Sequence, residues 1–180
     1  MLINFSMSRR HRTQAPRKPF MKVGSLTAQY TYEQLGKMDV EHDEQVNFYG
    51  VIIDANFPFK QDENKYVCNL KVVDASLNVH GKTDDFACVI MTGRRFEDLP
   101  ICQRVGDVIR CHRADFFMRG DDRFLKLNMT YNSSWALFSA DDIVAPEVED
   151  ENEDWQNKPY AYSGWNYTLE KNDKKALENI

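Results

Sequence analysis

The chain has 180 residues, of which 42% are hydrophobic and 28% are charged, and its formal net charge is −5. This length favours one domain with tails, because single domains usually have roughly 100–150 residues. No apolar run approaches the ~20 residues that span a bilayer, so no membrane helix is expected. The opening MLINFSM has no leading positive charge and does not resemble a secretory signal, so we expect the chain to stay inside the cell.

Charge is distributed unevenly along the chain. Residues 1–22 contain six basic residues and no acidic one, whereas residues 141–154 contain eight acidic residues and no basic one. Such runs are typical of solvated tails and linkers, although a basic arm also suits contact with a polyanion. We expect a basic disordered tail at 1–22, a lead-in segment at 23–45, a folded domain at 46–140, and an acidic linker with the start of a connecting helix at 141–180.

The first half of the folded domain predicts three β-strands. QVNFYGVIIDANF, residues 45–57, is rich in β-branched and aromatic side chains and is followed by a polar loop, PFKQDENK. YVCNLKVVD alternates, with Leu70 and Val72 on the face opposite to Asn69 and Lys71. FACVIMT forms the third strand. Gly50, inside the first strand, suits the sharp bend that a small barrel needs there.

The second half predicts a short helix and a hairpin. In GRRFEDLPI, Phe96 and Leu99 are spaced as on one helical turn, and Pro100 ends it. VGDVIRCHRADFF and RFLKLNMTY are strands joined by the turn RGDD. Five strands with a helix between the third and fourth is the order of the OB-fold, an all-β Greek-key barrel that binds oligonucleotides or oligosaccharides. A β-sandwich would need about seven strands and no central helix.

The four cysteines are scattered, without a C-x-x-C pair, and most lie inside apolar runs. We interpret them as reduced core residues. Cys102, Cys111 and His112 only loosely approximate the ligand spacing of a zinc site, so no metal is expected. The sequence also contains no phosphate-binding loop or Ser-His-Asp set, and we expect no enzyme.

Five blocks of the sequence resemble a known family. FYGVIIDANFPFK, KYVCNLKVVD, RRFEDLPI, GDVIRCHRA and SSWALFS follow one another as in the first OB domain of the telomere end-binding protein alpha subunit of ciliates, and more distantly in the protection-of-telomeres proteins. The resemblance implies a protein that binds the single-stranded, G-rich 3′ overhang and caps chromosome ends in the nucleus. It implies no catalysis and no cofactor, and it leaves open a second telomere-binding subunit as partner.

The resemblance also implies where DNA is bound. Single-strand binding needs aromatic side chains on which bases stack, each worth about 1–3 kcal/mol, and cations beside the phosphates. Phe59 and Lys60 stand at the family's loop between strands one and two, Lys71 at a groove lysine, and His112 with Arg113 at a DNA-facing pair. The complete set of candidate DNA-binding residues is Asn56, Phe59, Lys60, Lys71, Thr92, Arg94, His112, Arg113, Arg119, Arg123 and Tyr131.

Two departures from the family pattern keep a second function open. Thr92 and Arg119 stand where the family has base-stacking aromatics, and only arginine can stack in part through its guanidinium. Tyr131, Phe116 and Phe117 are possible substitutes, although aromatics in a barrel hairpin are more often core. The alternative is an OB-fold paralogue with weakened DNA binding that serves as a protein-interaction module in a telomere complex.

The end of the chain resembles the opening of the helix that leads to a second OB domain in the family. The chain is therefore expected to be either a piece of a longer protein or a short paralogue with one barrel. Trp155, Tyr160, Tyr162 and Trp165 are unusual in an acidic linker, and we expect them to pack against the barrel in preference to docking on a partner.

Overall fold

A computed structural model describes residues 30–41, 45–77, 85–141, 159–164 and 173–177, so the predicted basic tail lies outside the described residues. The elements, with η for a 3-10 helix, follow in chain order. They are η1 (Leu35–Lys37), β1 (Val46–Ala55), β2 (Phe59–Asp62), β3 (Lys65–Val73), β4 (Ala87–Gly93), η3 (Phe96–Asp98), β5 (Val108–Arg119), β6 (Asp122–Asn128), β7 (Ser134–Phe138), β8 (Ala161–Tyr162) and α2 (Asp173–Leu177).

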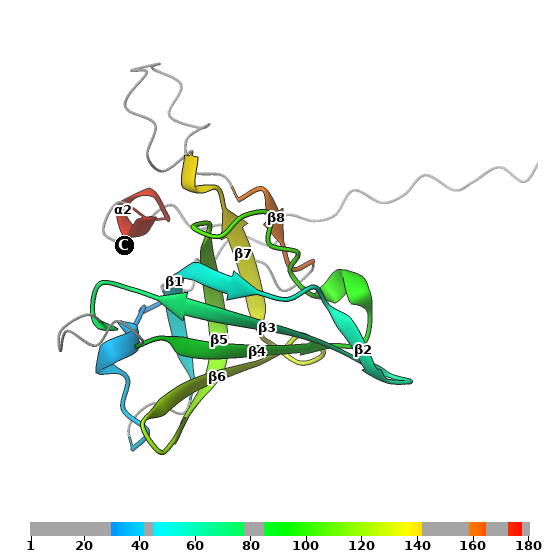
Figure 1. Cartoon of the computed structure of the whole chain (residues 1–180), viewed down its shortest axis with the longest axis horizontal. Coiled ribbons are helices and arrows are strands. Elements are labelled where there is room, and N and C mark those ends of the chain that lie inside the picture. Colours follow the sequence, from blue (N-terminus) through cyan, green and yellow to red (C-terminus); the bar gives the residue numbers. More distant parts are fainter. Residues whose placement is uncertain (1–29, 42–44, 78–84, 142–158, 165–172, 178–180) are drawn as a thin grey trace, which may run out of the picture.

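Five of these strands close into a barrel. Their order is β1, β3, β4, β6 and β5, and β5 pairs with β1 to complete the circle. β4 and β6 run parallel, while the other neighbours in the barrel are antiparallel. This is the predicted five-stranded Greek-key OB-fold (Figure 1). The predicted helix between the third and fourth barrel strands is η3, a single 3-10 turn.

β1 pairs with two neighbouring strands, β5 along its first half and β3 along its second half. Residues 46–51 pair with β5, and residues 51–55 pair with β3, with a register shift between Ile52 and Asp54. A Cβ atom added to Gly50 would lie 2.9 Å from the Cβ of Val72, closer than real side chains approach. Glycine at this position therefore lets β1 lie close to β3.

Because successive side chains of a strand point to opposite faces, every second side chain points into the barrel. The core includes Leu70 and Val72 from β3, Val89 and Met91 from β4, and Leu125 and Leu127 from β6. All four cysteines are free thiols, and only Cys68 and Cys111 are buried, whereas Cys88 and Cys102 are half-buried. Burial raises the pKa of the Cys68 thiol to about 12, so this thiol stays protonated at neutral pH. The interpretation as core residues is confirmed for two of the four.

The polar stretch PFKQDENK is not a plain loop, because β2 forms a hairpin with β3 inside it. The carboxylate of Asp62 accepts a hydrogen bond of 3.0 Å from the backbone N–H of Asn64 and thereby closes the turn. β7 pairs with the first half of β5, and β8 pairs with β7. Tyr160, just before β8, donates a hydrogen bond of 2.8 Å to Asp107, so this aromatic of the linker packs back as expected. Tyr162 is 54% exposed instead, and Trp155 and Trp165 lie outside the described residues.

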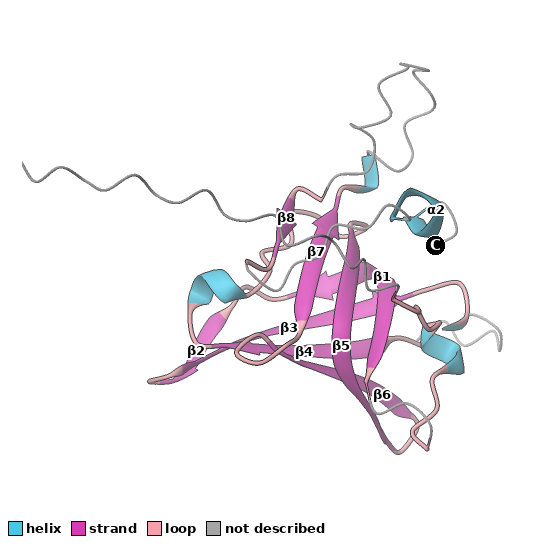
Figure 2. Cartoon of the chain, turned by 180° about the vertical axis from the view of Figure 1, so that it is seen from behind, coloured by secondary structure: helices cyan, strands magenta, loops and turns pink. Residues whose placement is uncertain are grey.

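The side of the barrel made by β1, β5 and β7 is covered by two further segments. Tyr32 in the lead-in and Ala176 and Leu177 in α2 pack on Tyr49, Ala136 and their neighbours, forming a second small cluster outside the barrel core. Figure 2 shows α2 beside the ends of β1 and β5. Among the described residues, no helix has the length and hydrophobicity to cross a membrane, and no group of His, Cys, Asp and Glu is arranged to hold a metal.

Candidate nucleic-acid interface

The barrel has a broad outer surface on β3, β4 and β6, which lie side by side in Figure 1. Directly paired residues of neighbouring strands share one face, so the pairings define three rows of outward side chains, which we call the outer face. The first row holds Phe59, Val67, Thr92 and Asn128, the second Asn69, Ile90, Lys126 and Asp115, and the third Lys71, Cys88, Phe124 and Phe117.

Aromatic rings stand at both ends of the outer face. Phe59, in the first row, keeps 46% of its surface exposed although it is large and apolar. In the third row, Phe117 and Phe124 stack with ring centroids 5.3 Å apart and an interplanar angle of 9°. Phe116, next in sequence, points into the core instead. The face therefore offers two separate platforms on which a base can stack.

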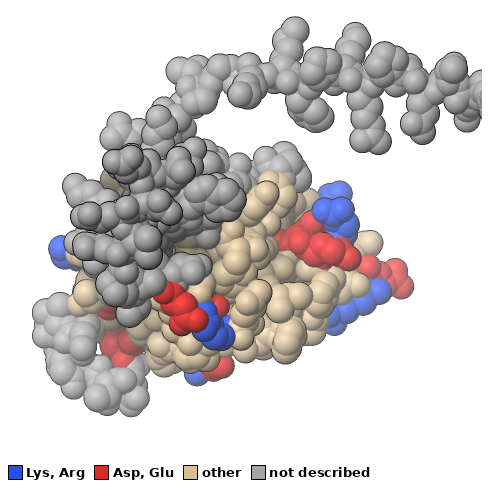
Figure 3. All heavy atoms as spheres, turned by 90° about the horizontal axis from the view of Figure 1, so that it is seen from above, with Lys and Arg blue, Asp and Glu red and all other residues tan. Residues whose placement is uncertain are grey.

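Cations accompany these aromatics. The ammonium of Lys71 lies 4.9 Å from the centre of the Phe86 ring and 3.5 Å from a carboxylate oxygen of Asp54. The guanidinium of Arg119 lies 5.6 Å from the Phe124 ring, and Lys126 is exposed in the middle row. On the side of the molecule that Figure 3 shows, from above the view of Figure 1, acidic side chains lie next to basic ones.

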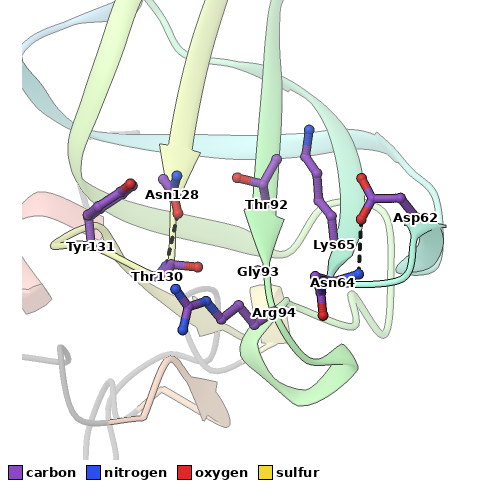
Figure 4. A pocket seen from close by; sticks show the side chains of 9 residues that line it. All are labelled: Asp62, Asn64, Lys65, Thr92, Gly93, Arg94, Asn128, Thr130 and Tyr131. Atoms are coloured by element: carbon purple, nitrogen blue, oxygen red, sulfur yellow. Dashed lines mark hydrogen bonds between the residues drawn. The ribbon is translucent and has the colours of Figure 1, made fainter.

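A pocket of about 270 Å³ lies at the Phe59 end of the face, where three elements end (Figure 4). All side chains that line it are polar apart from the glycine. The turn between β2 and β3, the end of β4 and the end of β6 supply these residues, which are Asp62, Asn64, Lys65, Thr92, Gly93, Arg94, Asn128, Thr130 and Tyr131.

Most of the residues predicted from the sequence lie on or beside the outer face. Phe59, Lys71 and Thr92 are in its rows, Arg94 and Tyr131 line the pocket, and Arg119 and Arg123 flank the β5–β6 turn. The guanidinium of Arg123 forms an ion pair with the carboxylate of Asp85, with an N–O distance of 2.6 Å. Lys60, paired with Tyr66, projects to the other side of β2 from Phe59, and the side chain of Asn56 accepts a bond from the backbone N–H of Asn69.

His112 and Arg113, which were predicted to face the DNA, lie away from the outer face; His112 is buried and Arg113 is half-buried. Both lie on the half of β5 that pairs with β1 and β7, where the lead-in covers them. His112 is 1% exposed, stacks on Tyr30 at 4.1 Å and shares a hydrogen bond of 2.7 Å with Tyr32. Arg113 donates hydrogen bonds to the hydroxyls of Tyr30 and Ser134 and to the carbonyl of Asn132. These two side chains anchor the lead-in.

Arg110 on the same strand also has a structural role. It is 2% exposed, and its guanidinium donates to both carboxylate oxygens of Asp173 in α2, at 2.7 and 2.8 Å. The hydroxyl of Tyr49 donates to the same carboxylate at 2.5 Å. Burial disfavours the charged guanidinium, but the charge and hydrogen bonds of Asp173, together with the interactions with Tyr32 and Tyr49, outweigh burial and raise the pKa of Arg110 above its usual value. The pair fastens α2 to the barrel.

The covered position of His112 predicts a pH-dependent stability. Burial, and then the positive charges of Arg110 and Arg113, lower the pKa of His112 from 6.5 to about 3. Between these values the unfolded chain binds a proton that the folded chain does not, so the free energy of unfolding falls as the pH falls. We expect urea unfolding at pH 7 and pH 5 to show a drop about 2 kcal/mol larger for wild type than for His112→Gln. Equal drops in the two proteins would contradict the buried, neutral state of His112.

Comparison with known proteins places this barrel in a family. Residues 27–180 match the family model described as telomeric single-stranded DNA binding POT1/CDC13. The match covers most of the chain and includes every strand of the outer face. The chain belongs to this family.

Individual relatives come from ciliates. The chain is 49% identical over 168 residues to a telomere-binding protein homolog of Euplotes crassus, which covers 93% of this chain and 35% of that protein. It is 42% identical to the telomere-binding protein subunit alpha of Stylonychia mytilus, over 88% of this chain and 34% of that protein. The chain thus spans about a third of the length of these relatives. A crystal structure of a Pot1–ssDNA complex aligns with a TM-score of 0.46 and 15% identity, over 58% of this chain and 59% of that chain.

Proposed function

We propose that the outer face binds single-stranded telomeric DNA and thereby contributes to capping chromosome ends, without catalysis. The observation that carries this proposal is the coincidence of two independent findings. The chain belongs to a family described by telomeric single-stranded DNA binding, and its outer face combines the exposed ring of Phe59 and the half-buried stacked pair of Phe117 and Phe124 with cations. Stacking on aromatic rings with cations beside the phosphates is how OB-folds hold single strands.

The length of the outer face suits a strand of several nucleotides. Its first and third rows meet β4 at Thr92 and Cys88, four residues apart, which corresponds to roughly 13 Å along a strand. A strand that stacks one base on Phe59 and another on Phe124 would pass Lys71 or Lys126 between them. We propose this course for the DNA, and the binding residues Phe59, Lys71, Thr92, Arg94, Phe124 and Tyr131.

The test of the proposed function is a titration by fluorescence anisotropy. The labelled strands are a G-rich telomeric repeat, a mixed-sequence single strand of equal length, and a duplex of the telomeric repeat. The telomeric single strand should bind more tightly than either competitor. Equal binding of all three, or binding of none, would reject the proposed function and would favour a protein-interaction barrel.

The cations of the outer face predict a specific salt dependence. Each phosphate contact of a single strand contributes about −0.7 to the slope of log affinity against log salt concentration. Lys71→Ala should therefore weaken binding and flatten the slope by roughly that amount. Arg104→Ala is the matched control, because Arg104 is half-exposed and paired with Asp141 beyond β7. Equal slopes for wild type and Lys71→Ala would show that Lys71 does not meet a phosphate.

Location and assembly follow from the same proposal. Two relatives are named subunit alpha, which supports the presence of a second telomere-binding subunit in the complete assembly. A protein that binds telomeric DNA works at the chromosome ends in the nucleus. We propose this location for the chain.

A further inference from the structure

The pocket beside Phe59 differs from the rest of the outer face because it is lined by hydrogen-bonding groups instead of aromatic platforms. Thr92 and Gly93 lie between its two sides in Figure 4, with Asp62 and Asn64 on one side and Arg94, Asn128 and Thr130 on the other. Thr92 is only 6% exposed and its hydroxyl donates to the carbonyl of Leu127 at 3.3 Å. A large side chain at position 92 would occupy the pocket, so the small threonine keeps it open.

Several polar groups of the pocket have unused hydrogen-bonding capacity. One carboxylate oxygen of Asp62 accepts from Asn64, and the amide oxygen of Asn128 accepts from the backbone N–H of Thr130 at 3.0 Å. The second oxygen of Asp62 and the amide nitrogen of Asn128 make no hydrogen bond to another described residue. The guanidinium of Arg94 is exposed and likewise makes no ion pair or hydrogen bond within the described part of the chain. The pocket therefore presents the acceptor of Asp62, beside the ammonium of Lys65, on one side and the donors of Arg94 and Asn128 on the other.

We propose that this pocket holds a single guanine base, with Arg94 reading its N7–O6 edge and Asp62 reading the adjacent N1–N2 edge; this inference rests on the proposed single-strand binding. Guanine presents two acceptors, N7 and O6, which suit the paired N–H donors of arginine. Its other edge presents the N1–H and N2 amino donors, which suit a carboxylate. Adenine offers an amino donor where arginine needs an acceptor, so the arrangement discriminates between the two purines.

Two neighbours complete the recognition of the base. The amide nitrogen of Asn128, on the same side as Arg94, adds a donor toward O6. The ring of Tyr131 is 73% exposed at the rim and provides a face on which the base can stack. Stacking gives affinity to any base, whereas Arg94 and Asp62 select guanine.

The experiment replaces single atoms of the DNA and the matching side chains of the protein. Each guanine of a G-rich single strand is changed in turn to 7-deazaguanine, which lacks the N7 acceptor, or to hypoxanthine, which lacks the 2-amino donor. Affinities are measured in lithium buffer, which disfavours guanine quartets. At one position, each analogue should weaken wild-type binding about tenfold.

The variants then show which side chain reads which edge. In Arg94→Ala the 7-deazaguanine penalty at that position should disappear, and in Asp62→Ala the hypoxanthine penalty should disappear. Arg94→Lys keeps the charge and should keep the salt slope while losing the N7 discrimination. Arg119→Ala, which removes a cation at the other end of the face, should leave both penalties intact. Thr92→Tyr, which fills the pocket, should abolish both.

The possible outcomes separate the two proposals. If the strand binds but no position shows a penalty, or if the penalties persist in Arg94→Ala and Asp62→Ala, the guanine pocket is rejected while single-strand binding stands. If no single strand binds to the folded wild-type chain, the proposed function itself fails, and the guanine pocket fails with it.

Discussion

Replacing Asp173 with alanine is expected to lower the free energy of unfolding by about 3–5 kcal/mol, although Asp173 lies far from the barrel in sequence. The substitution removes the carboxylate that accepts from the buried guanidinium of Arg110 and from the hydroxyl of Tyr49. Removing one partner of a buried ion pair costs more than the intact pair contributes, so the loss should exceed that of an ordinary surface substitution. Urea unfolding followed by circular dichroism measures it.

The matched control removes the whole polar cluster. Arg110→Met, Tyr49→Phe and Asp173→Leu together leave no buried charge or hydroxyl without a partner, and this triple variant should recover most of the lost stability. Asp54→Ala breaks the exposed pair of Asp54 with Lys71 and should change stability by less than about 1 kcal/mol. If Asp173→Ala loses no more than Asp54→Ala, α2 is not fastened to β5 as the structure shows.

Removing both aromatic platforms should have the largest effect on DNA affinity. Phe59→Ala and Phe124→Ala are each expected to cost about 1–3 kcal/mol of binding free energy, about tenfold or more in Kd. Because the two residues stand at opposite ends of the outer face, their effects should add in the double variant. Neither residue carries charge, so the salt dependence of binding should stay unchanged.

The control for this prediction is an aromatic on the other side of the barrel. Tyr162 in β8 is 54% exposed, and Tyr162→Ala should bind as wild type does. Thermal unfolding of each variant establishes that it is folded. Wild-type affinity of the folded double variant would show that DNA does not stack on this face.

The sequence was sufficient for the barrel because each barrel strand carries its own pattern. The alternation of Leu70 and Val72 with Asn69 and Lys71 assigns the two faces of β3 without any other part of the chain. The hairpin at Gly120, which has a positive φ of 61°, follows equally from the local turn residues. These features depend on neighbours in sequence, so they can be predicted from it.

The features that could not be predicted from the sequence are contacts made by segments that are distant along the chain. Alternation correctly puts Arg110 and His112 outside the barrel, but it cannot show that Tyr32 and Asp173 return to cover them. Phe117 was expected in the core because aromatics usually are, and its pairing with Phe124 places both on the outer face. The strict alternation of Phe124 with Leu125 was the signal that would have identified this second platform.

Photo-crosslinking tests most directly whether the β3–β4–β6 side of the barrel is the DNA-binding surface. A telomeric single strand that carries 4-thiothymidine is irradiated in complex with the chain, and mass spectrometry identifies the crosslinked peptides. We predict crosslinks within residues 59–71, 86–94 and 117–131, and their loss in the Phe59→Ala, Phe124→Ala double variant. Crosslinks confined to the covered side, at residues 30–33 or 173–177, would contradict this prediction.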